Sequence, residues 1–229
     1  MTEKVESESW EKLVTDVRTK AGVSYVEQEG KVDINGRSIF YRKVSKGTTE
    51  SCRGHVLFLH AGCYSSQTWL EHGSMHYFAS YGYSSTAIDM PGYGQTGLVK
   101  MDVGDPVTFM KCLYQALKIE RPVIISPSRS GDLSIPLIME HPELVRGYVP
   151  VSPHSTDKYT PEEYQKNQTQ TLITYGENDT EAGRKATANL RNLPNHRAQE
   201  FLGAGHHPYM DSPVKWHQLV YNFVESLAE

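Results

Sequence analysis

The segment with the clearest capacity for chemistry is Val123–Gly131, where three alternating serines follow an apolar run and precede a helical pattern. A buried strand, a sharp turn with one serine and a helix make up a nucleophile elbow, usually G-x-S-x-G. The positions two before and two after the nucleophile must be small, because strand and helix pass closely there. Ser126 and Ser130 meet this requirement around Ser128, which we predict to be a catalytic nucleophile.

The other two serines of the run fit an elbow less well. For Ser126, one flanking position would be Ile124, which is too bulky, and Ser130 falls inside the expected helix. Serine is also a favoured N-cap residue, so Ser128 could instead cap the helix that follows. By itself, this segment leaves the nucleophile and the cap evenly balanced.

A serine hydroxyl is a weak nucleophile at neutral pH and needs a general base, for which His206 is the candidate. His206 follows the last apolar run, and Gly203 and Gly205 allow its loop to turn back over the site. The alternative is a solvated loop histidine, since the chain has 10 histidines. The adjacent His207 suggests a metal, but no further ligands follow at a zinc-site spacing, and we expect no metal.

The base in turn needs a carboxylate that fixes its tautomer and stabilises its cation. Asp179 follows the apolar run that ends at Tyr175. It could equally be the N-cap of a helix over 180–192. The chain order Ser128, Asp179, His206 favours catalysis, because α/β-hydrolases carry their triad in this order.

An acyl-transfer site also needs hydrogen-bond donors for an oxyanion. The backbone N–H of Arg129, directly after the nucleophile, is one candidate. The second should come from Gly62, which follows the first central apolar run beside the equally small Ala61. The side chain of Arg129 could pair with an acidic group or only cover the surface.

These residues need a scaffold that brings distant segments together. Short apolar runs alternate with segments of helical length, which indicates an α/β fold with a mostly parallel sheet and helices on both faces. Such sheets bind ligands beyond the carboxyl ends of their strands, where the candidate residues fall. We expect strands at 55–59, 84–88, 122–125, 148–151, 171–175 and 197–201, and helices near 66–80, 104–119, 131–140, 180–192 and 212–227.

The amino-terminal part predicts two further elements. Apolar residues at helical spacing indicate that residues 1–20 are a helical extension, which either docks on the core or stands apart. An Asn35-Gly36 turn joins strands at 23–34 and 37–44 into a β-hairpin. Residues 21–229 then form one α/β domain.

The spacing of the strands excludes a large lid domain. Only about 18 residues separate the strand that ends near Ser152 from the one that begins near Thr171, with room for a short helix at 161–167. We therefore expect a shallow, open pocket. It favours short acyl groups, or an acyl group carried on a larger partner, over a buried lipid tail.

Composition limits the class of protein. The net charge is −4 and no basic block occurs, so nucleic acid is not an expected partner. Charged residues throughout the first 20 positions exclude a signal peptide there, and no apolar run has the length of a membrane span. Three widely spaced cysteines suit reduced thiols. We expect a cytoplasmic protein, with the nucleus as a second location.

Several motifs resemble the α/β-hydrolase superfamily and, within it, the abhydrolase domain-containing protein 14 family. The resemblance runs from about residue 23 to the carboxyl end. The motifs that carry it are Leu59–Gly62, Ser65–Trp69, Asp89–Gly94, Ser126–Gly131, Thr156–Lys158, Gly176–Asp179, Leu193–Arg197 and Gly203–His206. The Ser-x-Ser-x-Ser elbow is characteristic of this family, so the resemblance also implies that Ser128 is catalytic.

The family resemblance implies a serine hydrolase without a required cofactor, acting on small acyl esters. One branch is associated with removing acetyl groups from lysine and passing them to coenzyme A, and with a general transcription factor. The other carries a membrane anchor, so this chain looks like the first branch. It departs from the family at Ala61, where glycine is usual, and at Arg129, where an apolar residue is usual.

Two other functions fit the same sequence features. The chain could be a non-hydrolytic binding protein on this scaffold that interacts with transcription machinery, since fold does not dictate function. A cofactor-free haloperoxidase or perhydrolase would use the same triad. Absence of turnover on short acyl esters, together with a stable protein complex, would favour the binding protein.

Overall fold

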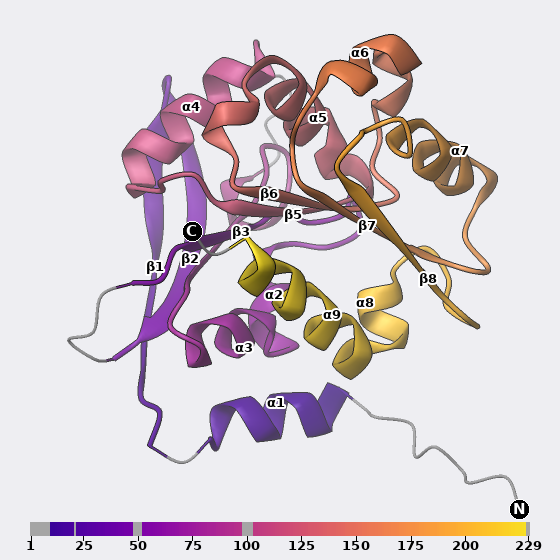
Figure 1. Ribbon diagram of the computed structural model, residues 1–229. Coiled ribbons are helices and arrows are strands. Elements are labelled where there is room, and N and C mark those ends of the chain that lie inside the picture. Colours follow the sequence, from indigo (N-terminus) through magenta and orange to yellow (C-terminus); the bar gives the residue numbers. More distant parts are fainter. Residues whose placement is uncertain (1–9, 21, 48–51, 98–102, 228–229) are drawn as a thin grey trace, which may run out of the picture.

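The protein is described here from a computed structural model that covers residues 10–20, 22–47, 52–97 and 103–227. Eight strands form one sheet in the order β1-β2-β4-β3-β5-β6-β7-β8 (Figure 1). Strands β1 and β2 form an antiparallel hairpin, β2 is antiparallel to β4, and all later pairs are parallel. The strands are Tyr25–Ile34, Arg37–Lys46, His55–Phe58, Ser84–Ile88, Val123–Pro127, Gly147–Val151, Thr171–Gly176 and His196–Phe201.

Helices cover both faces of this sheet. Helices α4, α5, α6 and α7 lie on one face, and α1, α2, α3, α8 and α9 lie on the other (Figure 1). The helices α1 to α9 are Trp10–Arg18, Ser66–Glu71, Ser74–Ser80, Pro106–Leu117, Gly131–Glu140, Pro161–Lys166, Glu181–Leu190, Pro208–Asp211 and Pro213–Ser226. The predicted α/β-hydrolase fold is thus confirmed, including its amino-terminal hairpin.

Two hydrophobic cores, one on each face, hold the layers together. Alternate residues of a strand point to opposite faces, so Phe58 packs into the core beneath α3 and α9 while Leu57 packs into the core beneath α4 and α5. Ile125 and Ile124 of β5 divide in the same way. Because β5 is buried on both faces, the turn that follows it is held in place from both sides.

The helix predicted near 66–80 is in fact two helices. α2 ends at Glu71, and Gly73 then adopts a left-handed conformation with φ of 70° before α3 begins. A Cβ atom on Gly73 would lie 3.3 Å from Cα of Val14 in α1. The chain breaks here because the two helices must turn where α1 approaches closely.

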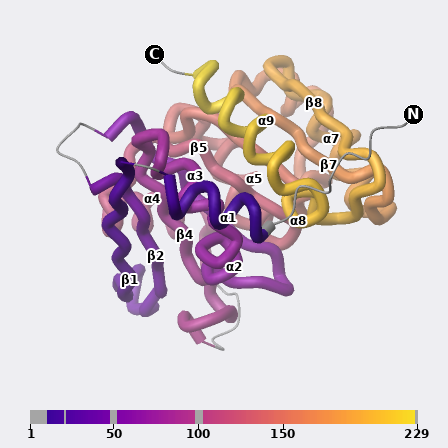
Figure 2. The backbone as a smooth tube through the Cα atoms, turned by 90° about the horizontal axis from the view of Figure 1, so that it is seen from below, coloured from indigo at the N-terminus to yellow at the C-terminus, as the bar shows by residue number. Residues whose placement is uncertain are grey.

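Helix α1 docks on the core and does not stand apart. Leu13 and Val17 are buried, and the Tyr25 hydroxyl donates a hydrogen bond to the Val17 carbonyl at 2.5 Å. Arg18 donates to the carbonyl of Leu70 at 3.1 Å. The view from below shows α1 alongside α3 (Figure 2). Residues 1–9 of the predicted extension lie outside the described residues.

The segment between β6 and β7 holds a 3-10 turn and the short helix α6, with no lid domain. Thr160 and Glu163 form a reciprocal capping box at the start of α6. Because this segment inserts no domain, the carboxyl ends of β3, β5, β6 and β7 are left uncovered.

None of the helices within the described ranges has the length and apolar character needed to cross a bilayer.

Candidate active site

The elbow begins directly after β5. Ser128 has φ of 49°, a left-handed conformation that a non-glycine residue adopts only where the surroundings impose it. The Ser128 carbonyl accepts a hydrogen bond from the N–H of His154 at 2.7 Å. Neither Ser128 nor another side chain caps the helical turns that follow, since Pro127 and Ser130 hold the cap positions without a side-chain bond. The N-cap interpretation of Ser128 is therefore wrong.

The flanking serines are buried and bonded to one another. The hydroxyl oxygens of Ser126 and Ser130 are 2.9 Å apart, and Ser126 also lies 2.7 Å from the hydroxyl of Ser134. Ser134 reaches the hydroxyl of Tyr148, at 2.9 Å, on the neighbouring strand β6. Each small hydroxyl thus finds a partner at the close strand–helix contact, where an unpaired one would be costly.

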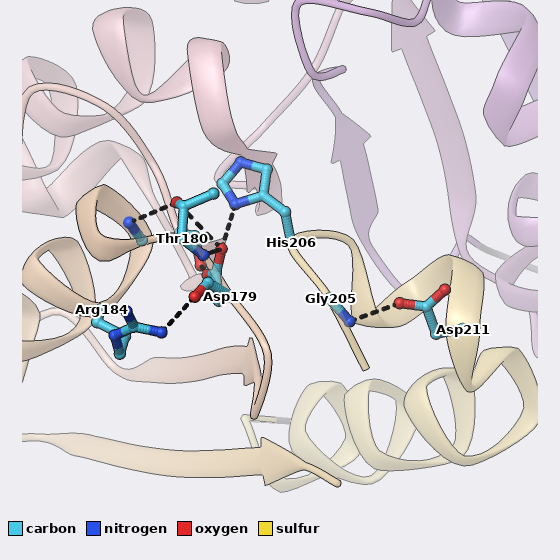
Figure 3. A network of polar contacts seen from close by, with 8 residues as sticks. Asp179, Thr180, Arg184, Gly205, His206 and Asp211 are labelled. Atoms are coloured by element: carbon cyan, nitrogen blue, oxygen red, sulfur yellow. Dashed lines mark hydrogen bonds and ion pairs between the residues drawn. The ribbon is translucent and has the colours of Figure 1, made fainter. Parts of the chain in front are cut away.

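Asp179 and His206 meet at the ends of two neighbouring strands. His206 Nδ1 lies 2.6 Å from Oδ1 of Asp179 (Figure 3). The Asp179 side chain is fully buried, while that of His206 is 26% exposed, so the imidazole is open to a ligand. Oδ1 of Asp179 also accepts from the backbone N–H of Thr180 at 2.6 Å. The pair can hold an imidazole in one tautomer with Nε2 free to act as a base.

Asp179 does not cap α7. Thr180 is the N-cap, and its hydroxyl accepts from the N–H of Gly183 at 3.1 Å. A Cβ atom on Gly183 would lie 2.1 Å from Oδ2 of Asp179, so only glycine leaves room for the carboxylate. This geometry excludes the alternative interpretation of Asp179 as a helix cap.

Ser152 is a site residue that the sequence did not single out. Its hydroxyl donates a hydrogen bond to Oδ2 of Asp179. Burial raises the pKa of Asp179, but the hydrogen bonds from His206 and Ser152 outweigh it, so the pKa lies below its usual value. Ser152 is 1% exposed and has φ of 47°. The available signal was its position, directly after the strand beside β5.

The loop that carries His206 is shaped by glycines on both sides. Gly203 has φ of 74°, as expected for a turn, whereas Gly205 does not need such a conformation. The N–H of Gly205 donates to Oδ2 of Asp211 at 2.8 Å (Figure 3). A Cβ atom on Gly176 would lie 2.0 Å from the Gly205 carbonyl oxygen. The close approach of the β7 end to this loop brings His206 to Asp179.

His207 has a different environment. Its ring makes edge contacts with Tyr64 and Tyr209. Burial, with the nearby His206, lowers the pKa of His207 to about 4. No cluster of potential metal ligands occurs within the described part of the chain.

The loop after β3 brings Gly62 to the elbow. A Cβ atom on Gly62 would lie 3.5 Å from Cβ of Arg129, so the two candidate oxyanion donors are neighbours. His60 braces this loop, because its Nδ1 lies 2.8 Å from the Ala61 carbonyl and its Nε2 accepts from the N–H of Met90 at 2.9 Å. Burial lowers the pKa of His60, which favours the neutral ring that can make both contacts.

A cavity of about 500 Å³ lies between the elbow and the Asp179–His206 pair, and Arg129 and His206 both line it. Among the described residues, the Ser128 hydroxyl forms no hydrogen bond with His206. Catalytic hydrogen bonds are often long without substrate and shorten when it binds. The structure thus joins Asp179 to His206 directly, and places Arg129, the residue after Ser128, at the cavity that His206 lines.

The order of strands, the elbow and the lidless sheet define an α/β-hydrolase. The chain is 38% identical over 204 residues to ABHD14B of Rattus norvegicus, covering 87% of this chain and 97% of the relative. It is 37% identical over 196 residues to ABHD14A of Danio rerio, covering 82% and 72%. The chain therefore belongs to the ABHD14 family.

One solved structure illustrates the shared fold. A "predicted CIB-like hydrolase" from Thermoplasma acidophilum superposes with a TM-score of 0.79 at 23% identity, covering 89% of this chain and 100% of the other. No family model matches the chain. The family assignment accordingly rests on the relatives, and the solved structure supports the fold.

Proposed function

We propose that this protein is a serine hydrolase that transfers acyl groups through a covalent intermediate on Ser128. His206 takes the proton of the Ser128 hydroxyl as the oxygen attacks the acyl carbonyl carbon. The bond from that carbon to the leaving group then breaks, and His206 returns the proton to the leaving group. Asp179 orients His206 and stabilises its cation.

The oxyanion of each tetrahedral intermediate is held by the backbone N–H groups of Gly62 and Arg129. In the second half of the reaction, water or a thiol attacks the acyl-enzyme and loses its proton to His206. The acyl–oxygen bond of Ser128 breaks and the hydroxyl is restored. The reaction needs no metal or bound cofactor, and coenzyme A serves only as an acceptor.

A single observation carries the proposal: the 2.6 Å contact between His206 and the buried Asp179. A carboxylate is costly to bury unless it is paired, and here four donors from His206, Ser152 and Thr180 converge on it. Such a pair lies at the edge of the sheet where ligands bind. Its geometry is that expected of the aspartate and histidine of a catalytic triad.

The substrate class follows from the relatives and from the missing lid. ABHD14B of rat bears the name "Putative protein-lysine deacylase". An acyl group on a protein lysine needs an open site, and the segment between β6 and β7 leaves it open. We therefore propose short acyl groups as substrates, carried on lysine side chains or on small esters.

A fluorophosphonate probe tests the nucleophile. Its phosphorus bonds to an activated serine oxygen as fluoride leaves, so the wild-type protein should be labelled. Ser128→Ala should not be labelled, while Ser38→Ala, at an exposed position of β2, should be labelled like the wild type. Equal labelling of Ser128→Ala and wild type would reject Ser128 as nucleophile.

An acetyl-lysine peptide tests the reaction itself. Mass spectrometry should show loss of the acetyl group with wild type and its retention with Ser128→Ala. Addition of coenzyme A distinguishes the acceptor, because acetyl-coenzyme A forms only if the thiol intercepts the acyl-enzyme. No loss of acetyl from peptide or from small esters, combined with a stable complex with a transcription protein, would instead support a binding protein.

A further inference from the structure

The guanidinium of Arg129 is anchored at the edge of the proposed active site. Its Nε lies 3.0 Å from Oδ2 of Asp132 in an ion pair that lacks hydrogen-bond geometry, and the Arg129 side chain is 43% exposed. Asp132 in turn accepts a hydrogen bond from the hydroxyl of Ser155 at 2.6 Å through its other oxygen. The guanidinium is thus held by a pair that spans the elbow and the loop after β6.

The terminal nitrogens of Arg129 are open. Neither forms a hydrogen bond or ion pair with any residue in the described ranges. A guanidinium whose Nε is occupied can still bind a carboxylate through its terminal nitrogens. Arg129 also lines the same cavity as His206, so an anion bound there would lie beside the reacting atoms.

The other charged groups of this cavity do not supply an equivalent site. Asp157 and Lys185 also line it, and both are exposed. They contribute one charge of each sign. A lysine ammonium is strongly hydrated and flexible, whereas an arginine held at one nitrogen is oriented before a ligand arrives.

The stem of Arg129 starts at the oxyanion donors. A Cβ atom on Gly62 would lie 3.5 Å and 3.8 Å from Cβ and Cγ of Arg129. The stem of Arg129 therefore lies next to Gly62, one of the two candidate oxyanion donors, while the residue also lines the cavity. An acyl group held by these donors would lie close to this stem.

We propose that Arg129 selects acyl groups with a second carboxylate, such as the succinyl and glutaryl groups of acylated lysine. This inference rests on the proposed function. In it, Arg129 binds the distal carboxylate while Ser128 attacks the amide carbonyl. Asp132 is a positioning residue that holds the guanidinium.

Two peptides of the same sequence, with one succinyl-lysine or one acetyl-lysine, test the selection. The quantity measured is the ratio of kcat/KM for succinyl over acetyl, so that any loss common to both substrates cancels. Wild type should prefer the succinyl peptide, and Arg129→Met should lower the ratio at least about tenfold. Lys185→Met, which removes another cation of the same cavity, should change it less than about twofold. A wild-type preference for acetyl, or an unchanged ratio in Arg129→Met, would overturn the inference.

A measurement on the wild-type protein avoids dependence on the variant's folding. Glutarate and butyrate compete with the fluorophosphonate probe, and glutarate should slow labelling at a concentration at least about tenfold lower. Equal protection by the two acids would contradict selection by Arg129.

The outcomes separate this inference from the proposed function. Turnover retained in Ser128→Ala would reject the proposed function. Turnover lost in Ser128→Ala with equal succinyl and acetyl rates in wild type would reject only the role of Arg129. An effect of Arg129→Met confined to reactions with coenzyme A would assign the guanidinium to a phosphate of the acceptor, and overturn its role toward the acyl group.

Discussion

The hydroxyl oxygens of Ser126 and Ser130 lie 2.9 Å apart, one at the end of β5 and the other just before α5. They occupy the two positions where glycines are usual in a nucleophile elbow. The elbow thus carries a buried hydrogen bond at the two positions where a glycine pair would have no side chain.

Substitution of Ser126 by alanine should destabilise the fold. The change removes hydrogen bonds to Ser130 and Ser134 in a fully buried place, which costs about 1–3 kcal/mol. Ser38→Ala, at an exposed position of β2, should change the unfolding free energy by less than about 0.5 kcal/mol. Urea unfolding of both variants measures the difference. Equal stability would mean that the serine network contributes nothing.

Loss of the Ser152 hydroxyl should shift the pH dependence of catalysis. This hydroxyl lowers the pKa of Asp179, so in Ser152→Ala the pKa of Asp179 rises. The carboxylate is then protonated at higher pH, and kcat/KM should fall earlier as the solution is acidified. The control is Ser226→Ala, whose hydroxyl instead donates to the Phe223 carbonyl within α9. Identical acid limbs in wild type and Ser152→Ala would remove Ser152 from the site.

The buried His217 should make the fold sensitive to mild acid. Burial lowers its pKa to about 4, from 6.5. Between these two pH values the unfolded state binds a proton at His217 that the folded state does not bind. The free energy of unfolding therefore falls as pH drops from about 6.5 toward 4. The full contribution is on the order of 3 kcal/mol. His217→Gln should lose less stability than wild type between pH 7 and pH 4.5 in urea titrations. An equal loss in both proteins would be evidence against this assignment.

Helix α1 should contribute to the stability of the whole domain. Leu13 is 4% exposed beneath it, so Leu13→Ala should cost about 2 kcal/mol through lost burial and a cavity. Thr15→Ala, on the exposed side of the same helix, serves as the matched control. Thermal unfolding measures the melting temperature of each variant against that of the wild type. If Leu13→Ala melted like Thr15→Ala, α1 would be an appendage without energetic coupling to the core.

The absence of a lid should restrict acyl-chain length. Each buried methylene contributes about 0.8 kcal/mol only where an apolar wall surrounds it. The cavity at Arg129 and His206 has instead a largely polar lining that includes Asp132 and Asn189. We expect kcat/KM for nitrophenyl esters to decline from acetate and butyrate to laurate. Faster turnover of laurate would show an apolar channel that this site lacks.

Much of the fold could be predicted because its signals are local. The Asn35-Gly36 turn joins β1 and β2, and each predicted central strand is present within one or two residues. The prediction of one continuous helix over 66–80 was wrong, because Gly73 separates α2 from α3. Gly73 packs against α1, and a contact between such distant segments leaves no signal in the local sequence.

The sequence proposed members of the candidate site but not how their side chains meet. Residue type and chain order selected Ser128, Asp179 and His206 from the sequence, since strand ends in a parallel sheet share one edge. Sequence left Asp179 equally able to cap a helix, and the structure excludes that, because Thr180 takes the cap. The fourth partner, Ser152, had no motif at all.

The amino-acid sequence by itself determined most of the strand and helix pattern, the small residues of the elbow and the lack of a lid, because these depend on neighbours along the chain. Only the tertiary structure decided that Ser152 bonds Asp179 and that Arg129 is anchored by Asp132 with its terminal nitrogens open. Both relations need side chains from different strand ends, or from a folded turn, to meet. Their energies depend on burial, which exists only once the sheet has brought its carboxyl edge together.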